Sequence, residues 1–270
     1  MADLRAALET ALGPLYRVER EVRPVGDCRV FVAAELPAGP ELVVKVLPGS
    51  LSLAVDVRLF EREVILLGDR LRHSTLASPR GAGRAGASVY HARAFVEGTT
   101  LRALLVRSGE LPLRQAVGIL RDALTGLAQA HAARVIHGDL KPENVLLAEG
   151  HAVVADTGIV DAVERSLDGC APGAATTALC ASPYVAPERR DGSTSAPGPR
   201  DDMYAVGVLT HEMLTGRPPA PESEPLEEVR ALPSWLAELV RRCLAPDPAA
   251  RWADAGAALA TLTRSRGNTE

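Results

Sequence analysis

Two short motifs carry the side chains that could do chemistry. Asp139, Lys141 and Asn144 lie within His137-Gly-Asp-Leu-Lys-Pro-Glu-Asn144, and Asp156 opens the segment Asp156-Thr-Gly158. Carboxylate and amide oxygens are the ligands that Mg²⁺ prefers, and a neighbouring ammonium can neutralise phosphate charge. A carboxylate in such a set can also accept a hydroxyl proton. These residue types predict phosphoryl transfer, which depends mainly on positioned oxygens and positive charge.

The scarcity of lysine singles out Lys45 as a second candidate functional position. Of the 30 basic residues, Lys45 and Lys141 are the only lysines, and all the others are arginines. Where arginine serves for ordinary surface charge, a retained lysine indicates work that a planar guanidinium cannot do. Lys45 lies in the apolar run Glu41-Leu-Val-Val-Lys-Val-Leu47, which is typical of a buried strand.

The elements that must position these residues change in type along the chain. Residues 4–12 have leucines at helical spacing, and residues 29–33, 41–47 and 89–96 have the composition of strands. A helix is predicted over residues 55–71, and residues 78–88 are predicted to form a turn or loop because they are rich in glycine.

Beyond Gly98 the pattern becomes mainly helical. Apolar residues at helical spacing predict a long helix around residues 117–131, followed by a hairpin over residues 145–147 and 151–155. Residues 161–200 are rich in Gly, Ala, Ser, Thr and Pro, so we expect a long loop with little regular structure. Further helices are predicted over residues 202–215, 235–244 and from 252.

Composition narrows the class of protein. Hydrophobic residues make up 47% and charged residues 24% of 270 residues, as in ordinary globular domains. The formal net charge of −4 excludes a nucleic-acid binder that relies on overall positive charge. The sequence contains no apolar run long enough to span a bilayer and no signal-peptide core. Four cysteines without a CxxC pair favour a reduced cytoplasmic protein.

With these motifs in place, the chain resembles bacterial eukaryotic-like Ser/Thr protein kinases from about Tyr16 to Leu262. The resemblance implies an α+β, bilobal protein-kinase-like fold. Its N-lobe, residues 1–96, would be small and β-rich with one main helix, and its C-lobe, residues 97–270, larger and mainly helical. It also implies ATP and Mg²⁺ as cofactors and a protein substrate with a Ser or Thr acceptor. No nucleic-acid partner and no membrane span are expected, and the sequence leaves the oligomeric state open.

The resemblance assigns roles to the catalytic residues by position. Asp139 matches the catalytic base, and Lys141 matches the lysine near the γ-phosphate. Asn144 and Asp156 match the metal ligands. Lys45 matches the lysine that binds the α- and β-phosphates, with Glu63 as its ion-pair partner.

The nucleotide-binding residues follow from the same resemblance. Gly26 and Val30 match the phosphate loop and the strand after it, and Ala94 and Val96 match the segment that receives the adenine. Lys45, Asn144 and Asp156 complete this set. Family pattern also implies that Asp202 anchors the catalytic loop and that Glu188 pairs with Arg251.

Two of the departures from the family pattern bear directly on phosphate binding and on activation. Arg23, Val25 and Cys28 stand where the three phosphate-loop glycines belong, and side chains there obstruct the approach of backbone N–H groups to phosphates. Gly138 replaces the arginine that pairs with a phosphorylated activation loop, so activity is expected not to require that phosphorylation.

Two alternatives to an active Ser/Thr kinase follow. The altered glycine loop is compatible with a pseudokinase that acts as a binding or scaffold module. His137-Gly-Asp139 is also similar to the motif of small-molecule phosphotransferases of the aminoglycoside-kinase type, whereas Ala186-Pro-Glu188 favours a protein kinase.

Overall fold

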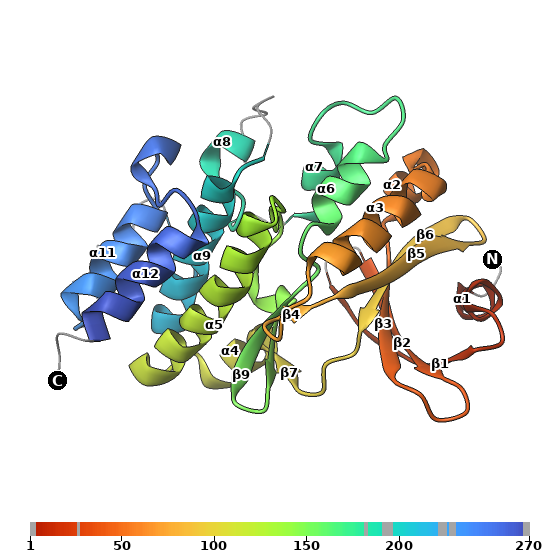
Figure 1. Ribbon diagram of the computed structural model, residues 1–270, viewed down its shortest axis with the longest axis horizontal. Coiled ribbons are helices and arrows are strands. Elements are labelled where there is room, and N and C mark those ends of the chain that lie inside the picture. Colours follow the sequence, from red (N-terminus) through yellow and green to blue (C-terminus); the bar gives the residue numbers. More distant parts are fainter. Residues whose placement is uncertain are drawn as a thin grey trace. The chain divides into compact units, whose positions relative to one another are not determined.

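The computed structural model describes residues 4–25, 28–180, 183–190, 197–220, 226 and 231–266 (Figure 1). The chain forms two compact units. The first unit contains Met1–Arg72, Ala77–Glu97 and Gly158–Leu179, and the second contains His73–Leu76, Gly98–Thr157 and Cys180–Glu270. The lobe boundary between residues 96 and 97 stays a prediction.

The first unit is built on an antiparallel sheet of five strands in the order β1-β2-β3-β6-β5. The strands are β1 (Tyr16–Val25), β2 (Cys28–Glu35), β3 (Glu41–Val46), β5 (Pro79–Ala85) and β6 (Ser88–Ala94). The strands predicted within residues 29–33, 41–47 and 89–96 are therefore confirmed. Their apolar side chains alternate between the two faces of the sheet, so both faces need a cover.

Helices supply those covers. Helix α1 (Leu4–Leu12) packs against β1 and β5 with Leu8 fully buried, in a cluster that includes Phe31, Val44 and Tyr90. Helix α3 (Val57–Arg70) packs against β5 with Phe60 and Val64 fully buried. The short helix α2 (Gly49–Ala54) comes directly before α3. The helices predicted over residues 4–12 and 55–71 are both present.

The prediction of a loop over residues 78–88 was wrong. Most of this stretch forms β5, which pairs with β6 at the edge of the sheet. One of its glycines, Gly83, lies close to a side chain, since a Cβ there would be 2.9 Å from the hydroxyl oxygen of Tyr90. Gly86, with a φ of 60°, lies in the turn between β5 and β6, so only part of the glycine signal marked a turn.

The long loop predicted over residues 161–200 was also partly wrong. This stretch contains the end of α6 (Ile159–Arg165), together with α7 (Ala174–Leu179) and α8 (Pro187–Arg190). The Glu164 carboxylate accepts hydrogen bonds from the backbone N–H groups of Gly173 (2.6 Å) and Ala175 (2.8 Å) at the start of α7. A carboxylate at a helix N-terminus stabilises the helix, which explains order in a weakly patterned segment.

The second unit is mainly helical. Its longer helices are α4 (Leu101–Ser108), α5 (Leu113–Ala132), α9 (Pro199–Thr215), α11 (Ser234–Cys243) and α12 (Ala255–Arg266). Short 3₁₀ turns lie at η1 (Pro142–Asn144) and η2 (Pro248–Ala250). A small sheet has the order β4-β9-β8-β7, from β4 (Leu76–Ala77), β7 (Thr99–Thr100), β8 (Val145–Ala148) and β9 (His151–Ala155).

The core of the second unit forms where α5 contacts α9, α12 and β9. Leu120, Leu124 and Leu127 of α5 are fully buried, as the predicted apolar stripe requires. The hairpin that follows is β8–β9, paired from Val145 opposite Val154 onward. Because the start of β8 pairs with the end of β9, the two chemical motifs lie at the same, open end of the hairpin.

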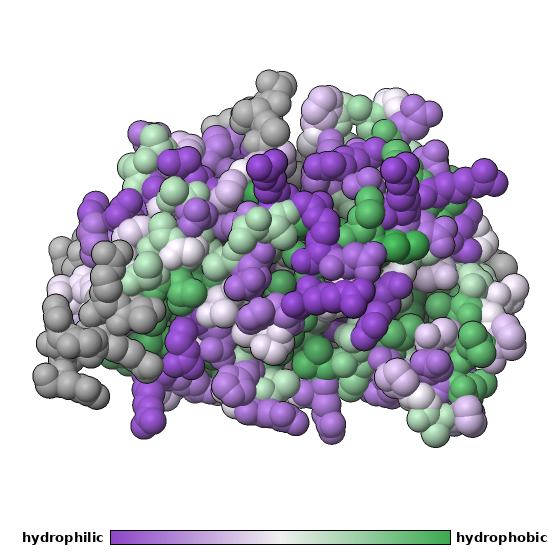
Figure 2. Space-filling view, viewed as in Figure 1, coloured by the Kyte–Doolittle hydropathy of each residue, from purple (hydrophilic) through white to green (hydrophobic). Residues whose placement is uncertain are grey.

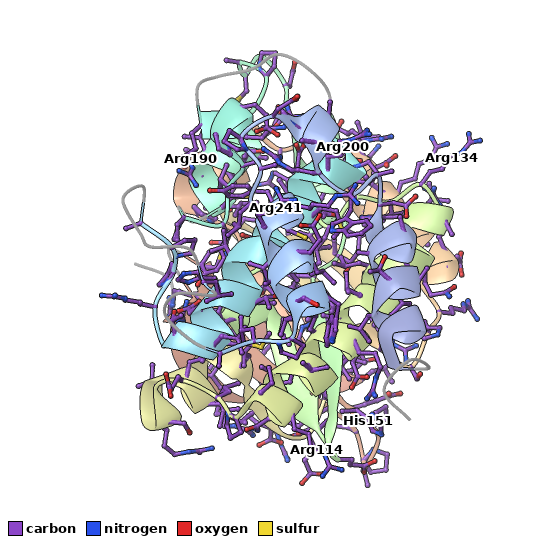
Figure 3. All side chains as sticks on the ribbon, turned by 90° about the vertical axis from the view of Figure 1, so that its left-hand side faces the viewer. Arg114, Arg134, His151, Arg190, Arg200 and Arg241 are labelled. Carbon is purple, nitrogen blue, oxygen red and sulfur yellow. The ribbon has the colours of Figure 1, made fainter. Side chains whose placement is uncertain are left out.

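The surface is ordinary for a globular chain. The face drawn in Figure 2 is largely hydrophilic, with apolar residues in scattered groups, and Leu53 and Val106 are the most exposed of the large hydrophobics. Arginines such as Arg114 and Arg134 extend outward from the second unit (Figure 3). No helix among the described residues is long and apolar enough to cross a membrane.

Candidate active site

Asp202 near the start of α9 holds the segment from His137 to Asn144 in place. Its carboxylate is buried and accepts hydrogen bonds from the backbone N–H groups of His137 (2.7 Å) and Gly138 (2.9 Å). His131 at the end of α5 contributes a third contact, with Nε2 2.9 Å from Oδ2. Burial raises the pKa of Asp202, but these donors outweigh burial and the net pKa is lowered. The predicted anchoring role of Asp202 is confirmed.

His137 has a structural role within the motif. Its Nδ1 accepts a hydrogen bond from the backbone N–H of Asp139 (3.2 Å), so Nε2 carries the proton and donates to the carbonyl of Ala155 (3.0 Å). A second proton on Nδ1 would face an N–H donor. Complete burial disfavours the charged imidazolium and lowers the pKa of His137, although the carboxylates of Asp202 and Asp139 act in the opposite direction. The neutral imidazole joins the two motifs.

Asp139, Lys141 and Asn144 converge. The Lys141 ammonium lies 2.9 Å from Oδ1 and 2.6 Å from Oδ2 of Asp139. The Asn144 amide donates to the backbone carbonyl of Asp139 (2.8 Å) and to its Oδ2 (3.0 Å). Burial disfavours the charge on Lys141, but the Asp139 carboxylate outweighs it and raises the pKa of Lys141. The structure thus brings together the predicted base, ammonium and amide.

Asp156 follows β9 and has an unusual backbone conformation. Its φ is 62°, in the left-handed region that few residues other than glycine adopt, and its side chain is buried. Such strain concentrates at functional sites because the surrounding structure must enforce it. The hairpin β8–β9 joins Asp156 to Asn144, which directly precedes β8.

The donor set fits Mg²⁺ bound together with a nucleotide. Asp156 offers carboxylate oxygens, and the Asn144 amide nitrogen faces Asp139, which directs the amide oxygen elsewhere. The described residues contain no group of three or more His, Cys, Asp or Glu side chains that could hold a metal. Mg²⁺ in phosphoryl-transfer sites uses one or two protein ligands and completes its shell with phosphates and water. Asn144 and Asp156 offer oxygen atoms of the kind that this role needs.

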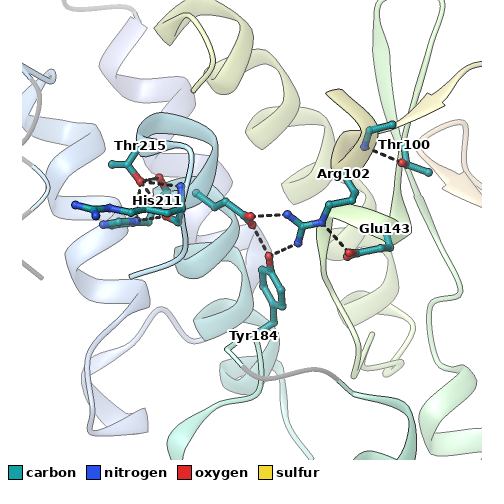
Figure 4. A network of polar contacts seen from close by, with 9 residues as sticks. Thr100, Arg102, Glu143, Tyr184, His211 and Thr215 are labelled. Atoms are coloured by element: carbon teal, nitrogen blue, oxygen red, sulfur yellow. Dashed lines mark hydrogen bonds and ion pairs between the residues drawn. The ribbon is translucent and has the colours of Figure 1, made fainter. Parts of the chain in front are cut away.

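A polar network beside the catalytic loop was missed by the sequence analysis (Figure 4). Arg102 of α4 donates to Glu143 Oε1 (2.7 Å), to Glu212 Oε1 of α9 (2.5 Å) and to the hydroxyl of Tyr184 (2.8 Å). The Tyr184 hydroxyl in turn donates to Glu212 Oε2. Because these residues are far apart in sequence, no local pattern could identify the network. It ties Tyr184, which lies just before Ala186-Pro-Glu188, to the catalytic loop.

Two further contacts hold the chain after the motifs. The Cys180 thiol donates to the carbonyl of Gly138 (3.2 Å), and burial together with the nearby Asp139 raises the pKa of Cys180, so the thiol is neutral. The Arg251 guanidinium is buried and binds both oxygens of Glu188, at 2.7 and 2.9 Å. The predicted pair of Glu188 and Arg251 is therefore confirmed.

The first unit carries the remaining predicted residues. Lys45 lies at the centre of the sheet, opposite Val30 of β2 and His91 of β6, and is half-buried. Glu63 on α3 makes an ion contact with Arg165 of α6, with Oε2 and Nη1 4.0 Å apart. An ion pair between Lys45 and Glu63 stays a prediction.

The predicted base-binding segment follows β6. Ala94 ends this strand and pairs with Leu42, and Val96 lies just beyond it. Val30 is buried in β2. Gly26 lies outside the described residues, and the side chains of Arg23 and Val25 are likewise not described. The predicted phosphate-loop contacts therefore stay predictions.

Comparison with known proteins gives a consistent result. Residues 27–261 match the protein kinase domain. The chain is 32% identical to the serine/threonine-protein kinase PknL of Mycobacterium tuberculosis, over 94% of this chain and 66% of that protein. It is also 32% identical to the serine/threonine-protein kinase pkn3 of Myxococcus xanthus, over 92% of this chain and 49% of that protein. The chain thus spans about half to two thirds of these relatives.

Solved structures support the fold independently. The crystal structure of the Mycobacterium tuberculosis PknI kinase domain superposes with a TM-score of 0.72 at 23% identity, covering 93% of this chain and 96% of that one. The predicted two-lobed fold is confirmed, with a β-sheet N-terminal region and a helical C-terminal region.

Proposed function

Because the chain belongs to the protein kinase domain family, we propose that it is a Ser/Thr protein kinase that transfers the γ-phosphate of a nucleoside triphosphate, ATP by family resemblance, to a protein hydroxyl. The observation that carries this proposal is the convergence of Asp139, Lys141 and Asn144 in a loop held by Asp202. A structural loop would not need a buried ammonium and a carboxylate side by side.

Each residue has a defined task in this proposal. The Asp139 carboxylate orients the acceptor hydroxyl and accepts its proton. Lys141 neutralises charge on the phosphoryl group as it moves, and Lys45 of β3 holds the nucleotide phosphates, with Glu63 as its proposed partner. Asn144 and Asp156 would hold Mg²⁺, which when bound would screen the phosphate charge.

We also propose that activity is independent of activation-loop phosphorylation. Gly138 has a φ of 80°, a backbone conformation suited to glycine. It offers no side chain that could pair with a phosphorylated residue of the activation loop. The Thr176→Ala, Thr177→Ala, Ser182→Ala variant is expected to keep its activity. Strict loss of activity in that variant would contradict this part of the proposal.

The compartment and partners follow from the chemistry. None of the four cysteines, all of which the structure describes, forms a disulfide, which suits a reducing cytoplasm that also supplies nucleoside triphosphates. The proposed partner is a protein with a Ser or Thr acceptor. The region around Ala186-Pro-Glu188, anchored by Arg251 and Tyr184, supports a protein acceptor over a small molecule.

Intact-mass spectrometry after incubation with a generic protein acceptor, Mg²⁺ and ATP or GTP tests the proposal. The wild-type protein is expected to add phosphoryl groups to itself or to the acceptor, whereas the Asp139→Asn and Lys45→Ala variants are not. No transfer by the folded wild-type protein would overturn the proposal in favour of a pseudokinase. Equal transfer by all three proteins would show that these residues are not catalytic.

A further inference from the structure

An arginine lies where the first unit is expected to receive the nucleotide base. Arg93 is the residue before Ala94 in β6, pairs across the sheet with Val43 of β3, and is 8% exposed. Lys45 pairs with His91 on the same two strands. Because side chains alternate along a strand, Arg93 and His91 share a face with Lys45. The opposite face carries Val44, Tyr90 and Ala92, which pack in the core with α1.

The guanidinium engages the backbone of the predicted base-binding segment. Nη1 of Arg93 donates a hydrogen bond to the carbonyl oxygen of Ala94 (3.1 Å). The N–H of Ala94 donates to the carbonyl of Ser78 (3.4 Å), so both backbone groups of Ala94 have partners within the chain. A carbonyl keeps a second lone pair, but any ligand that approaches it here meets a neighbouring cation that carries only donors.

The two purines present opposite groups at position 6. Adenine has a 6-amino group that donates hydrogen bonds, whereas guanine and hypoxanthine have a 6-oxo group that accepts them. Arginine remains charged even when buried and has five N–H donors and no acceptor. A 6-amino group beside Arg93 would place donor against donor. A 6-oxo group would accept from the guanidinium, as guanine O6 does from arginine in nucleic-acid recognition.

We infer that Arg93 sets the base specificity of this site and that the chain binds 6-oxopurine nucleotides, such as GTP, more tightly than ATP. The inference rests on the proposed function, because it takes the segment from Ala94 to Val96 as the base-binding edge. It replaces ATP as the preferred phosphoryl donor and leaves the roles of Asp139 and Lys141 unchanged.

Calorimetric binding of nonhydrolysable analogues with Mg²⁺ tests the inference without any turnover. Analogues of ATP, GTP and ITP are compared, because ITP has the 6-oxo group of guanine but lacks its 2-amino group. The variants are Arg93→Met, which keeps an apolar stem of similar length, and Arg93→Gln. The matched control is Arg80→Met, which removes an exposed arginine from the neighbouring strand β5. Thermal unfolding verifies that each variant is folded.

We expect the wild-type protein to bind the GTP and ITP analogues with similar affinity, each on the order of ten-fold more tightly than the ATP analogue. Arg93→Met should abolish or reverse this preference, and Arg80→Met should keep it. Equal or tighter binding of the ATP analogue by the wild-type protein overturns the inference, as does a preference that Arg93→Met leaves unchanged. Tight binding of the GTP analogue without the ITP analogue also overturns it, because the 2-amino group would then be read. Failure of every analogue to bind contradicts the proposed function itself.

Discussion

Replacement of Asp202 should destabilise the second unit and disorder the catalytic loop. The carboxylate accepts from two backbone N–H groups, of His137 and Gly138, and from the imidazole of His131. Asp202→Ala removes the acceptor for all three donors at once. His131 has an additional tie, since its Nδ1 accepts from the N–H of Ala255 at the start of α12, and this contact fixes its proton on Nε2.

The size of the effect follows from the number of donors left without an acceptor. Each buried donor without a partner costs about 1–3 kcal/mol. For three donors, with water entering the space left by the side chain, we expect Asp202→Ala to lower the free energy of unfolding by about 3–5 kcal/mol. Asp202→Asn should cost less, because one amide oxygen can still accept from a backbone N–H. A domain whose stability lies in the upper part of the typical range of about 5–15 kcal/mol would remain folded.

Urea unfolding followed by circular dichroism measures the loss, with Asp168→Ala as the control. Asp168 is exposed, and its removal should change the free energy of unfolding by less than about 0.5 kcal/mol. Phosphotransfer by folded Asp202→Ala protein should fall strongly, since the loop that carries Asp139 loses its anchor. A cost below about 1 kcal/mol, or one equal to that of Asp168→Ala, would refute the reasoning.

Contacts in the second unit lead to three further predictions. Burial lowers the pKa of His137, so its contribution to stability is present above the ordinary pKa of histidine and is lost as the pH falls below it. Urea unfolding at several pH values should show this loss, and His137→Asn should flatten the dependence of the unfolding free energy on pH. An identical pH dependence in His137→Asn and the wild-type protein would contradict the assignment. Arg251→Met removes the ion-pair partner of Glu188 and should lower the free energy of unfolding, measured by heat or urea, by about 3–5 kcal/mol. A loss below about 1 kcal/mol would be incompatible with a stabilising pair around the buried Arg251 guanidinium. Lys141→Met should reduce kcat by about 10²-fold or more with the fold intact. Lys141→Arg should not restore kcat, because the site accepts a compact ammonium, and full activity with arginine would contradict that role.

Much of the fold was accessible from the sequence. Strands β2, β3 and β6 of the first unit and the long helix α5 have strong apolar patterns, and the structure contains them as predicted. Strand β5 was missed because its glycines resemble a turn, although Gly83 lies within the strand beside the Tyr90 side chain. Helix α7 was missed because Glu164 caps its N-terminus, and α6 was missed because it is stabilised by packing against α3 and α7 rather than by composition.

The candidate site was only partly accessible from the sequence. Asp139, Lys141 and Asn144 are close in the chain, so their convergence could be inferred from motif spacing. The network around Arg102 joins segments more than a hundred residues apart, and a single sequence gives no signal for it. The contact of Arg93 with the Ala94 carbonyl likewise required coordinates.

Identification of the phosphorylated group gives the most direct test of the central claim. The wild-type protein and Asp139→Asn are incubated with a generic protein acceptor, Mg²⁺ and γ-labelled ATP or GTP, and the products are separated and hydrolysed. Our account predicts label on serine or threonine of a protein with the wild type only. Label that appears solely as inorganic phosphate or on a small-molecule acceptor, or an equal amount of protein label with Asp139→Asn, would contradict it.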